Sequence, residues 1–143
     1  MARPRTLTES DFEVRPSKFP GAGLGLFAKV PVRKGDTIAY YTGKILTDKQ
    51  SDREPYVSSR YLLWVCKDHW IYGEGPAAGY ARLINHCHDK PNAELVVSTR
   101  WKTARIRALR AIPAGQEILY DYGPDYWETL GQHPAQGKHK GQK

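Results

Sequence analysis

Short runs of branched and aromatic residues, separated by turn residues, recur along this chain. Ser59–Cys66 and His69–Tyr72 are rich in such residues and lie two residues apart, which predicts a β-hairpin. Asn92–Ser98 and Thr103–Arg110 alternate in the same way and predict two further strands around a turn near Arg100. The pattern favours a mainly β domain.

Helical signals are few and short. The chain carries 10 prolines and 13 glycines, scattered along its length, and these disfavour long helices. Thr47–Arg53 predicts a short helix with Thr47 as its cap, and Gly79–Ile84 predicts a single helical turn. We therefore expect several small sheets joined by specific turns.

Two segments share a spacing at a constant offset of 80 residues. In each, an apolar strand enters, a turn with Pro and Gly follows, and an alternating strand leaves. Two interpretations stay open: a duplicated scaffold unit, or a spacing common to any two strand-turn-strand units. The first copy has Ala28, Val32, Gly35, Ile38, Tyr40 and Gly43, and the second has Ala108, Ile112, Gly115, Ile118, Tyr120 and Gly123.

Length and charge bound the domain organisation and the partners. A chain of 143 residues suits a single domain, which we expect at residues 10–130, between a flexible N-terminus (1–9) and a disordered basic tail (131–143). The net charge of +7 favours acidic or nucleic-acid-associated partners. Two cysteines cannot build a disulfide framework, and no stretch has the roughly 18 apolar residues needed to cross a bilayer. We expect a soluble, non-exported protein without membrane association.

Two segments carry the most specific motifs. Ala81–Leu95 reads ARLINHCHDKPNAEL and Gly115–Gly123 reads GQEILYDYG. In order and spacing they resemble the N-H-S-C-x-P-N and G-E-E-L-x-Y-D-Y-G signatures of the SET domain, the fold of a family of S-adenosylmethionine-dependent protein lysine methyltransferases. Gly21–Phe27 resembles the glycine-rich opening of that family, and Tyr41–Gly43 resembles its Y-x-G segment. The resemblance covers roughly residues 10 to 127.

The resemblance implies a fold and a set of roles. The fold is a SET-domain β-clip of several small sheets with short helices and a C-terminal pseudoknot-like crossing, here without flanking cysteine-rich modules. Tyr122 matches the catalytic tyrosine and Tyr41 a channel tyrosine. Tyr120 matches the position where family members carry Phe or Tyr, and Tyr there favours monomethylation.

The same resemblance implies a site for S-adenosylmethionine, with S-adenosylhomocysteine as its product. Glycine permits close approach of a ligand to the backbone because it has no Cβ. Trp127 is the candidate lid of the lysine channel, in place of a cysteine-rich module. The matching cofactor-binding positions are Gly23, Leu24, Gly25, Arg82, Asn85, His86, Tyr122 and Trp127.

Amine methylation explains why such a site holds aromatic residues rather than many acids and bases. The attacking lysine must be neutral, which costs about 4 kcal/mol near neutral pH, at 1.36 kcal/mol per pKa unit. A narrow apolar channel and a nearby sulfonium both lower that cost. Nine tyrosines and four tryptophans supply suitable walls.

Other interpretations of these residues stay open. His86, Cys87, His88 and Asp89 form a cluster of metal-ligand types, but adjacent side chains rarely converge on one ion, so we expect no metal. A catalytically silent SET-like binding module and a small basic nucleic-acid-binding β domain are the alternative functions. The expected partner is a lysine-containing protein or peptide, and a dimer stays open. The expected location is cytoplasmic for a bacterial protein, and nuclear or host-chromatin-associated for a viral, eukaryotic or secreted one.

Overall fold

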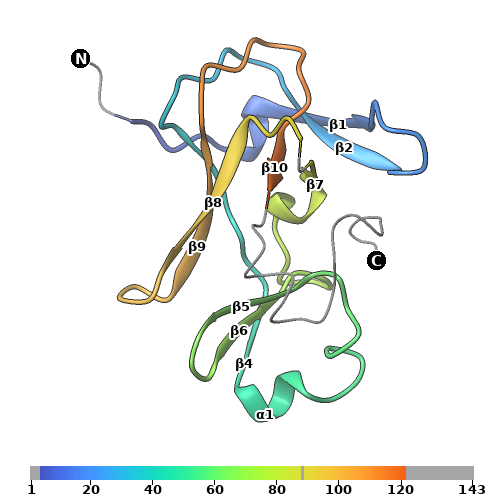
Figure 1. Cartoon of the computed structure of the whole chain (residues 1–143), viewed down its shortest axis with the longest axis vertical. Coiled ribbons are helices and arrows are strands. Elements are labelled where there is room, and N and C mark those ends of the chain that lie inside the picture. Colours follow the sequence, from blue (N-terminus) through green and yellow to red (C-terminus); the bar gives the residue numbers. More distant parts are fainter. Residues whose placement is uncertain (1–3, 88, 122–143) are drawn as a thin grey trace.

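Ten short strands dominate residues 4–87 and 89–121, the part of the chain that this computed structural model describes (Figure 1). The longest helix among them has four residues, and none could cross a membrane. The elements in chain order are η1 (Glu9–Asp11), β1 (Phe12–Pro16), β2 (Leu24–Ala28), β3 (Thr37–Tyr40), β4 (Lys44–Leu46), α1 (Asp48–Ser51), β5 (Leu62–Cys66), β6 (His69–Tyr72), η2 (Tyr80–Leu83), β7 (Asn85–His86), β8 (Ala93–Ser98), β9 (Thr103–Ala108) and β10 (Leu119–Asp121).

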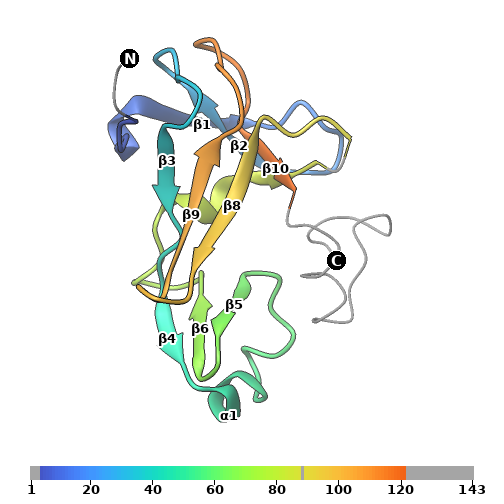
Figure 2. The same cartoon turned by 60° about the vertical axis from the view of Figure 1, so that its left-hand side comes forward.

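The strands form three small sheets. β1 and β2 make a hairpin, β4, β6 and β5 make a three-stranded sheet, and the largest sheet has the order β3-β9-β8-β10-β7. Figure 2 shows the chain passing from β3 into β4, and so from the largest sheet to the three-stranded one. The mainly β architecture predicted from the sequence is confirmed.

Local residue chemistry explains where these elements turn and begin. Asp68 (φ 59°) closes the β5–β6 hairpin and Lys102 (φ 55°) closes the β8–β9 hairpin, both in the left-handed region that tight turns use. Thr47 caps α1 by accepting a hydrogen bond from the Gln50 backbone N–H at 3.1 Å. The Gln50 side chain accepts in return from the Thr47 backbone N–H at 2.9 Å. The two predicted hairpins and the Thr47 cap are confirmed.

The two segments that share the offset of 80 residues contact each other in space. Each of the equivalent residues Val32 and Ile112 donates its backbone N–H to the carbonyl oxygen of the other at 2.9 Å. The Gly35 N–H donates to Ala108 at 2.9 Å, and its counterpart Gly115 donates to Ala28 at 2.7 Å. Each of these hydrogen bonds in one segment has a counterpart between the equivalent residues of the other. The shared spacing therefore reflects two arches related by a pseudo-twofold axis.

A crossing of the chain lies where the last described strand enters the largest sheet. β10 lies between β7 and β8 and runs parallel to both (Figure 1). β7 and β8 follow each other in sequence, so the later strand β10 is inserted between two earlier neighbours. The Asn92 side chain fastens this crossing: its Nδ2 donates to the Glu117 carbonyl at 2.9 Å, and its Oδ1 accepts from the Leu119 N–H at 2.8 Å. β10 thus lies between two strands that follow each other in sequence, as the pseudoknot-like arrangement implied by the motifs requires.

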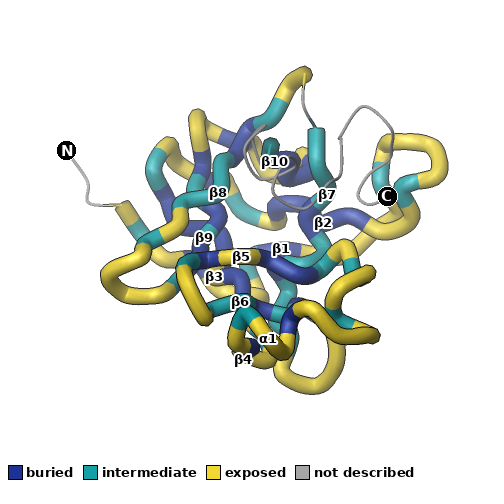
Figure 3. The backbone as a smooth tube through the Cα atoms, turned by 60° about the horizontal axis from the view of Figure 1, so that its bottom comes forward, coloured by how far each residue is buried: buried dark blue, intermediate teal, exposed yellow. Residues whose placement is uncertain are grey.

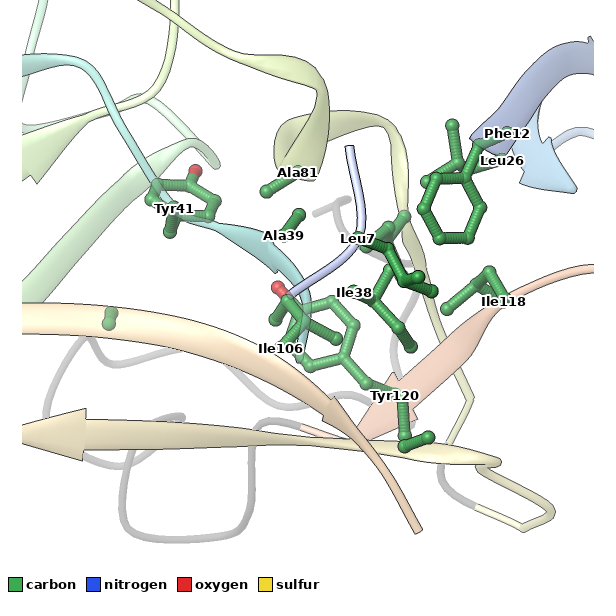
Figure 4. Close-up of a cluster of buried hydrophobic side chains, with 14 of the residues drawn as sticks. Leu7, Phe12, Leu26, Ile38, Ala39, Tyr41, Ala81, Ile106, Ile118 and Tyr120 are labelled. Atoms are coloured by element: carbon green, nitrogen blue, oxygen red, sulfur yellow. The ribbon is translucent and has the colours of Figure 1, made fainter. Parts of the chain in front are cut away.

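The hydrophobic core lies between the β1–β2 hairpin and the largest sheet and continues into the three-stranded sheet (Figures 3 and 4). Burial of apolar surface is the main stabilising contribution of such a core. Its members of largest volume below 2% exposure include Tyr120, Leu26, Ile38, Leu63, Ile106, Ile112, Ile118, Val32 and Val65. The core therefore supports the same strands that carry the sequence motifs.

Residues before the first strand also pack on the domain, which differs from the flexible segment predicted at residues 1–9. Leu7 is only 8% exposed, and its backbone N–H donates to Thr37 at 2.8 Å. The Arg5 guanidinium donates to the buried Asp36 carboxylate at 2.6 Å. The prediction judged local composition, whereas the partners of Leu7 and Arg5 lie about 30 residues away. Residues 1–3 and 131–143 lie outside the described part.

Candidate active site

The glycine-rich loop between β1 and β2 forms one wall of the candidate site. Its ends are joined by a hydrogen bond from the Ser17 N–H to the Gly23 carbonyl at 2.8 Å. Gly21 and Gly23 have φ values of 80° and 75°, a backbone conformation that glycine adopts without strain. A Cβ placed on Gly23 would meet no atom of the described residues within 4 Å, so these residues leave the space beside it open. Gly23 therefore satisfies the condition for close approach of a ligand.

Gly25, two residues later, lacks a side chain for a different reason. A Cβ on Gly25 would lie 2.3 Å from Oε2 of Glu117 and 3.2 Å from Nδ2 of Asn85. The Glu117 carboxylate therefore occupies the space that a side chain at position 25 would need. The sequence pattern alone does not separate these two uses of glycine.

The Glu117 carboxylate is the central group of the cluster, although its residue is only 1% exposed. The Ser17 hydroxyl donates to it, at 2.8 Å from Oε2 and 3.1 Å from Oε1. The Lys18 backbone N–H donates to Oε1 at 3.1 Å, and Nδ2 of Asn85 donates to Oε2 at 3.0 Å. Three donors from two separate segments offset the cost of burying this carboxylate.

Asn85 links the carboxylate to the glycine-rich strand. Its Nδ2 also donates to the Leu24 carbonyl oxygen at 3.1 Å. Because the Leu24 and Glu117 oxygens are both acceptors there, only the nitrogen end of the amide can face them. The Oδ1 of Asn85 therefore points away from both, and it remains an acceptor for a group outside the cluster.

The other predicted cofactor positions lie on neighbouring elements. His86 pairs with Tyr120 across β7 and β10, its side chain is 6% exposed, and its Nδ1 is 3.8 Å from Oδ1 of Asp121. Arg82 lies partly exposed in η2, which packs against β2 and β3. The crossing thus brings β7 and β10 together, with the glycine-rich strand held to β7 through Leu24 and Asn85.

Two of the three predicted catalytic tyrosines are described, and both are buried. Tyr41 is 4% exposed and its hydroxyl donates to the Tyr61 carbonyl oxygen at 2.8 Å. Tyr120 is 1% exposed and lies in the core at β10 (Figure 4). Tyr122 follows β10 directly in sequence, and it and Trp127 lie outside the described residues.

Tyr80 is a structural tyrosine by comparison. Its hydroxyl donates to the Ile38 carbonyl oxygen at 2.5 Å, and its ring centroid is 5.8 Å from that of Phe12. Burial, with the nearby charges of Asp11 and Glu9, raises the pKa of the Tyr80 phenol to about 12. This phenol stays protonated at neutral pH and serves the core.

The motif match included Glu117, but sequence reasoning assigned it no role, and it did not consider Ser17. The signal for Glu117 was present, because the residue directly precedes the apolar run Ile-Leu-Tyr and a carboxylate buried beside such a run requires partners. Ser17 carried no comparable signal, since its partner is 100 residues away.

These features define a mainly β domain in which a crossing chain joins a glycine-rich hairpin, the Asn85–His86 strand and the strand before Tyr122. A family model described as "SET domain" matches residues 23–123. The chain therefore belongs to the SET-domain family of protein-lysine N-methyltransferases, and the resemblance of its motifs is confirmed.

The chain is also similar to curated histone-lysine methyltransferases. It is 32% identical over 111 residues to mouse histone-lysine N-methyltransferase NSD3, which covers 72% of this chain and 8% of that protein. It is 30% identical to the human H3 lysine-36 specific histone-lysine N-methyltransferase (70% of this chain, 4% of that protein). It is 28% identical to the maize histone-lysine N-methyltransferase EZ2 (82% and 14%). The chain thus spans a small part of the length of these relatives.

Proposed function

We propose that this domain transfers a methyl group from S-adenosylmethionine to a lysine side chain of a protein, mainly to the monomethyl stage. The observation that carries the proposal is the meeting of Gly25, Asn85 and Glu117 in one hydrogen-bonded cluster. These residues come from the three segments that match the family motifs. Because Asn85 pairs with Leu119, the cluster lies at the start of β10, the strand that leads to Tyr122.

The residues present suit the methyl donor. The described residues leave open space beside Gly23, and Asn85, which is hydrogen-bonded to the next residue, Leu24, directs its Oδ1 away from the cluster as an acceptor. When bound, S-adenosylmethionine supplies an activated methyl group on a cationic sulfur. We assign its binding to the segment that contains Gly23 and Leu24, to the Asn85–His86 strand, and to Arg82 and Trp127.

The lysine side of the site is assigned to tyrosines. Enclosed aromatic surroundings favour the neutral amine, because burial penalises the ammonium form. Positioning of that amine then accounts for most of the remaining catalysis. The burial of Tyr41 and Tyr120 supports a narrow channel with little room, and Tyr122 is the proposed catalytic tyrosine.

A histone or another basic DNA-associated protein is the proposed substrate. Three of the similar proteins are named histone-lysine methyltransferases, one of them specific for H3 lysine 36. The net charge of +7 favours approach to DNA-covered targets and disfavours free basic tails. Histones within nucleosomes are therefore expected to be better substrates than free histone peptides.

Transfer of a labelled methyl group to histones and nucleosomes tests the proposal. Tyr122→Phe should lose turnover and retain binding of S-adenosylhomocysteine, measured by calorimetry. Tyr80→Phe is the matched control, because this tyrosine serves the core, and it should keep transfer. Transfer by Tyr122→Phe at the wild-type rate would overturn the assignment. Cofactor binding by the wild type without transfer to any protein would instead identify a silent binding module.

A further inference from the structure

The buried Glu117 carboxylate has a larger role than the motif match assigned to it. It faces Ser17 and Lys18 from the loop after β1, Gly25 from β2 and Asn85 from β7. These are two walls of the proposed cofactor site, held by one side chain. A change at Glu117 therefore reaches both walls at once.

We propose that Glu117 is a positioning residue of the cofactor site, an inference that rests on the function proposed above. Its carboxylate fixes the Asn85 amide with the nitrogen inward, so that Oδ1 of Asn85 accepts a hydrogen bond from the cationic amino group of the bound methyl donor. It also ties the Ser17–Lys18 turn to the same point. Glu117 itself contacts no substrate in this arrangement.

The orientation of Asn85 follows from the acceptors around it. Nδ2 has two hydrogens, and the Leu24 carbonyl and Oε2 of Glu117 take one each, at 3.1 and 3.0 Å. If the carboxylate were replaced by a group that donates, the amide could turn over. It would then present its nitrogen outward, where a cationic amino group needs an acceptor.

The carboxylate is not required to hold the crossing itself. The Asn92 side chain fastens the backbone of the same segment, by bonds to the Glu117 carbonyl and the Leu119 N–H. Those bonds use main-chain atoms of residues 117 and 119 and not the Glu117 side chain. A substitution that keeps the size of Glu117 should therefore change the site more than the fold.

Glu117→Gln tests this separation of roles. The amide matches the carboxylate in size, but one end of it must face a donor, either the Lys18 N–H or Nδ2 of Asn85. We expect the affinity for S-adenosylhomocysteine, measured by calorimetry, to fall roughly tenfold, because a hydrogen bond to a charged group is lost. Glu94→Gln is the control: Glu94 pairs with Arg107 and is partly exposed, and its change should leave the affinity unaltered.

A double-mutant cycle separates positioning from a general structural effect. The proposed effect on affinity runs through Asn85, and the Ser17–Lys18 turn is assigned no separate contribution to binding. Asn85→Ala alone and Asn85→Ala with Glu117→Gln should therefore bind S-adenosylhomocysteine equally well. Independent effects would multiply, to about a hundredfold loss for two tenfold effects, and would overturn the proposal. Wild-type affinity in Glu117→Gln would overturn it as well, while leaving the methyltransferase function intact. If the wild-type chain bound no S-adenosylhomocysteine, both the role of Glu117 and the methyltransferase function would be rejected.

Gly25→Ala reaches the same contact without changing the carboxylate, in case Glu117→Gln does not fold. Its Cβ would lie 2.3 Å from Oε2 and points into the protein, so it displaces the carboxylate from Asn85. We expect a similar loss of S-adenosylhomocysteine affinity, and none beyond that of Asn85→Ala when the two are combined. Unchanged binding by a folded Gly25→Ala variant, judged by circular dichroism, would contradict the proposal.

Discussion

Val32 and Ile112, which lie 80 residues apart, form two reciprocal backbone hydrogen bonds of 2.9 Å. They are equivalent positions of the two arches, so the pseudo-twofold axis passes between them. Gly35 and Gly115 are equivalent too, with φ values of 89° and 93°. The symmetry therefore extends from the hydrogen bonds to the conformation of the turns.

The turn glycines should therefore respond alike to substitution. Gly35→Ala and Gly115→Ala should each destabilise the fold by about 1–2 kcal/mol, because an L side chain is strained at these φ values. No close contact with a described residue adds to this cost. The nearest such atom to a Cβ on Gly35 is 3.8 Å away, and none lies within 4 Å of a Cβ on Gly115. Urea unfolding measures both. Asn at either position should cost less than Ala, since it adopts positive φ more readily, and a neutral Gly115→Ala would refute the argument.

The crossing depends on one amide side chain. Asn92→Ala leaves the Glu117 carbonyl and the Leu119 N–H without their partner inside the protein. We expect a loss of about 2–6 kcal/mol in the free energy of unfolding, at about 1–3 kcal/mol for each of the two unsatisfied groups. The opening free energy measured by hydrogen exchange at the Leu119 amide should fall by the same amount, so exchange there should be faster. Ser98→Ala, at the far end of β8, removes an exposed hydrogen bond from the Trp101 N–H and should leave exchange at Leu119 unchanged.

The hairpins, the α1 cap and the order of the motifs could be predicted because their signals are local. The positions of Thr47, Asp68 and Lys102 depend on neighbours a few residues away. The role of Glu117 could not be predicted, since its partners Ser17 and Lys18 are 100 and 99 residues distant. The local pattern places a glutamate before a buried strand, but it does not show which donors offset the cost of burying the carboxylate.

The docking of the N-terminal residues should make stability depend on acidic pH. Burial opposes ionisation of Asp36, but hydrogen bonds from Arg5 and Arg33 outweigh it and hold the pKa of this carboxyl below its ordinary value of 3.8. The ionised group therefore stabilises the fold above that value, and the contribution is lost as pH falls through the folded pKa.

Asp36→Asn isolates this contribution. At neutral pH it should cost about 1–3 kcal/mol, because buried donors lose a charged partner. The difference from the wild type should shrink as pH falls below about 4. Urea unfolding across this range checks it. Glu13→Gln, at a half-exposed pair with Arg15, should show a small difference at every pH. A constant difference for Asp36→Asn would contradict the assigned cause.

Tyr120 sets the room left for a second methyl group in the proposed reaction. It is 1% exposed within the core, so its ring cannot move aside without disturbing its neighbours. Tyr120→Phe removes only the hydroxyl oxygen and frees about the volume that one further methyl group needs. We expect dimethylated lysine to appear beside the monomethyl product, measured by mass spectrometry of the reacted protein.

Tyr41→Phe is the matched control for that experiment. Its hydroxyl is held by the Tyr61 carbonyl, so its removal should lower the rate without changing the ratio of products. The total methyl transferred by Tyr120→Phe should stay within about tenfold of the wild type, because the substitution leaves the proposed catalytic Tyr122 in place. An unchanged product ratio in Tyr120→Phe would show that the hydroxyl at position 120 does not limit the methylation state, and the monomethyl assignment would then be discarded.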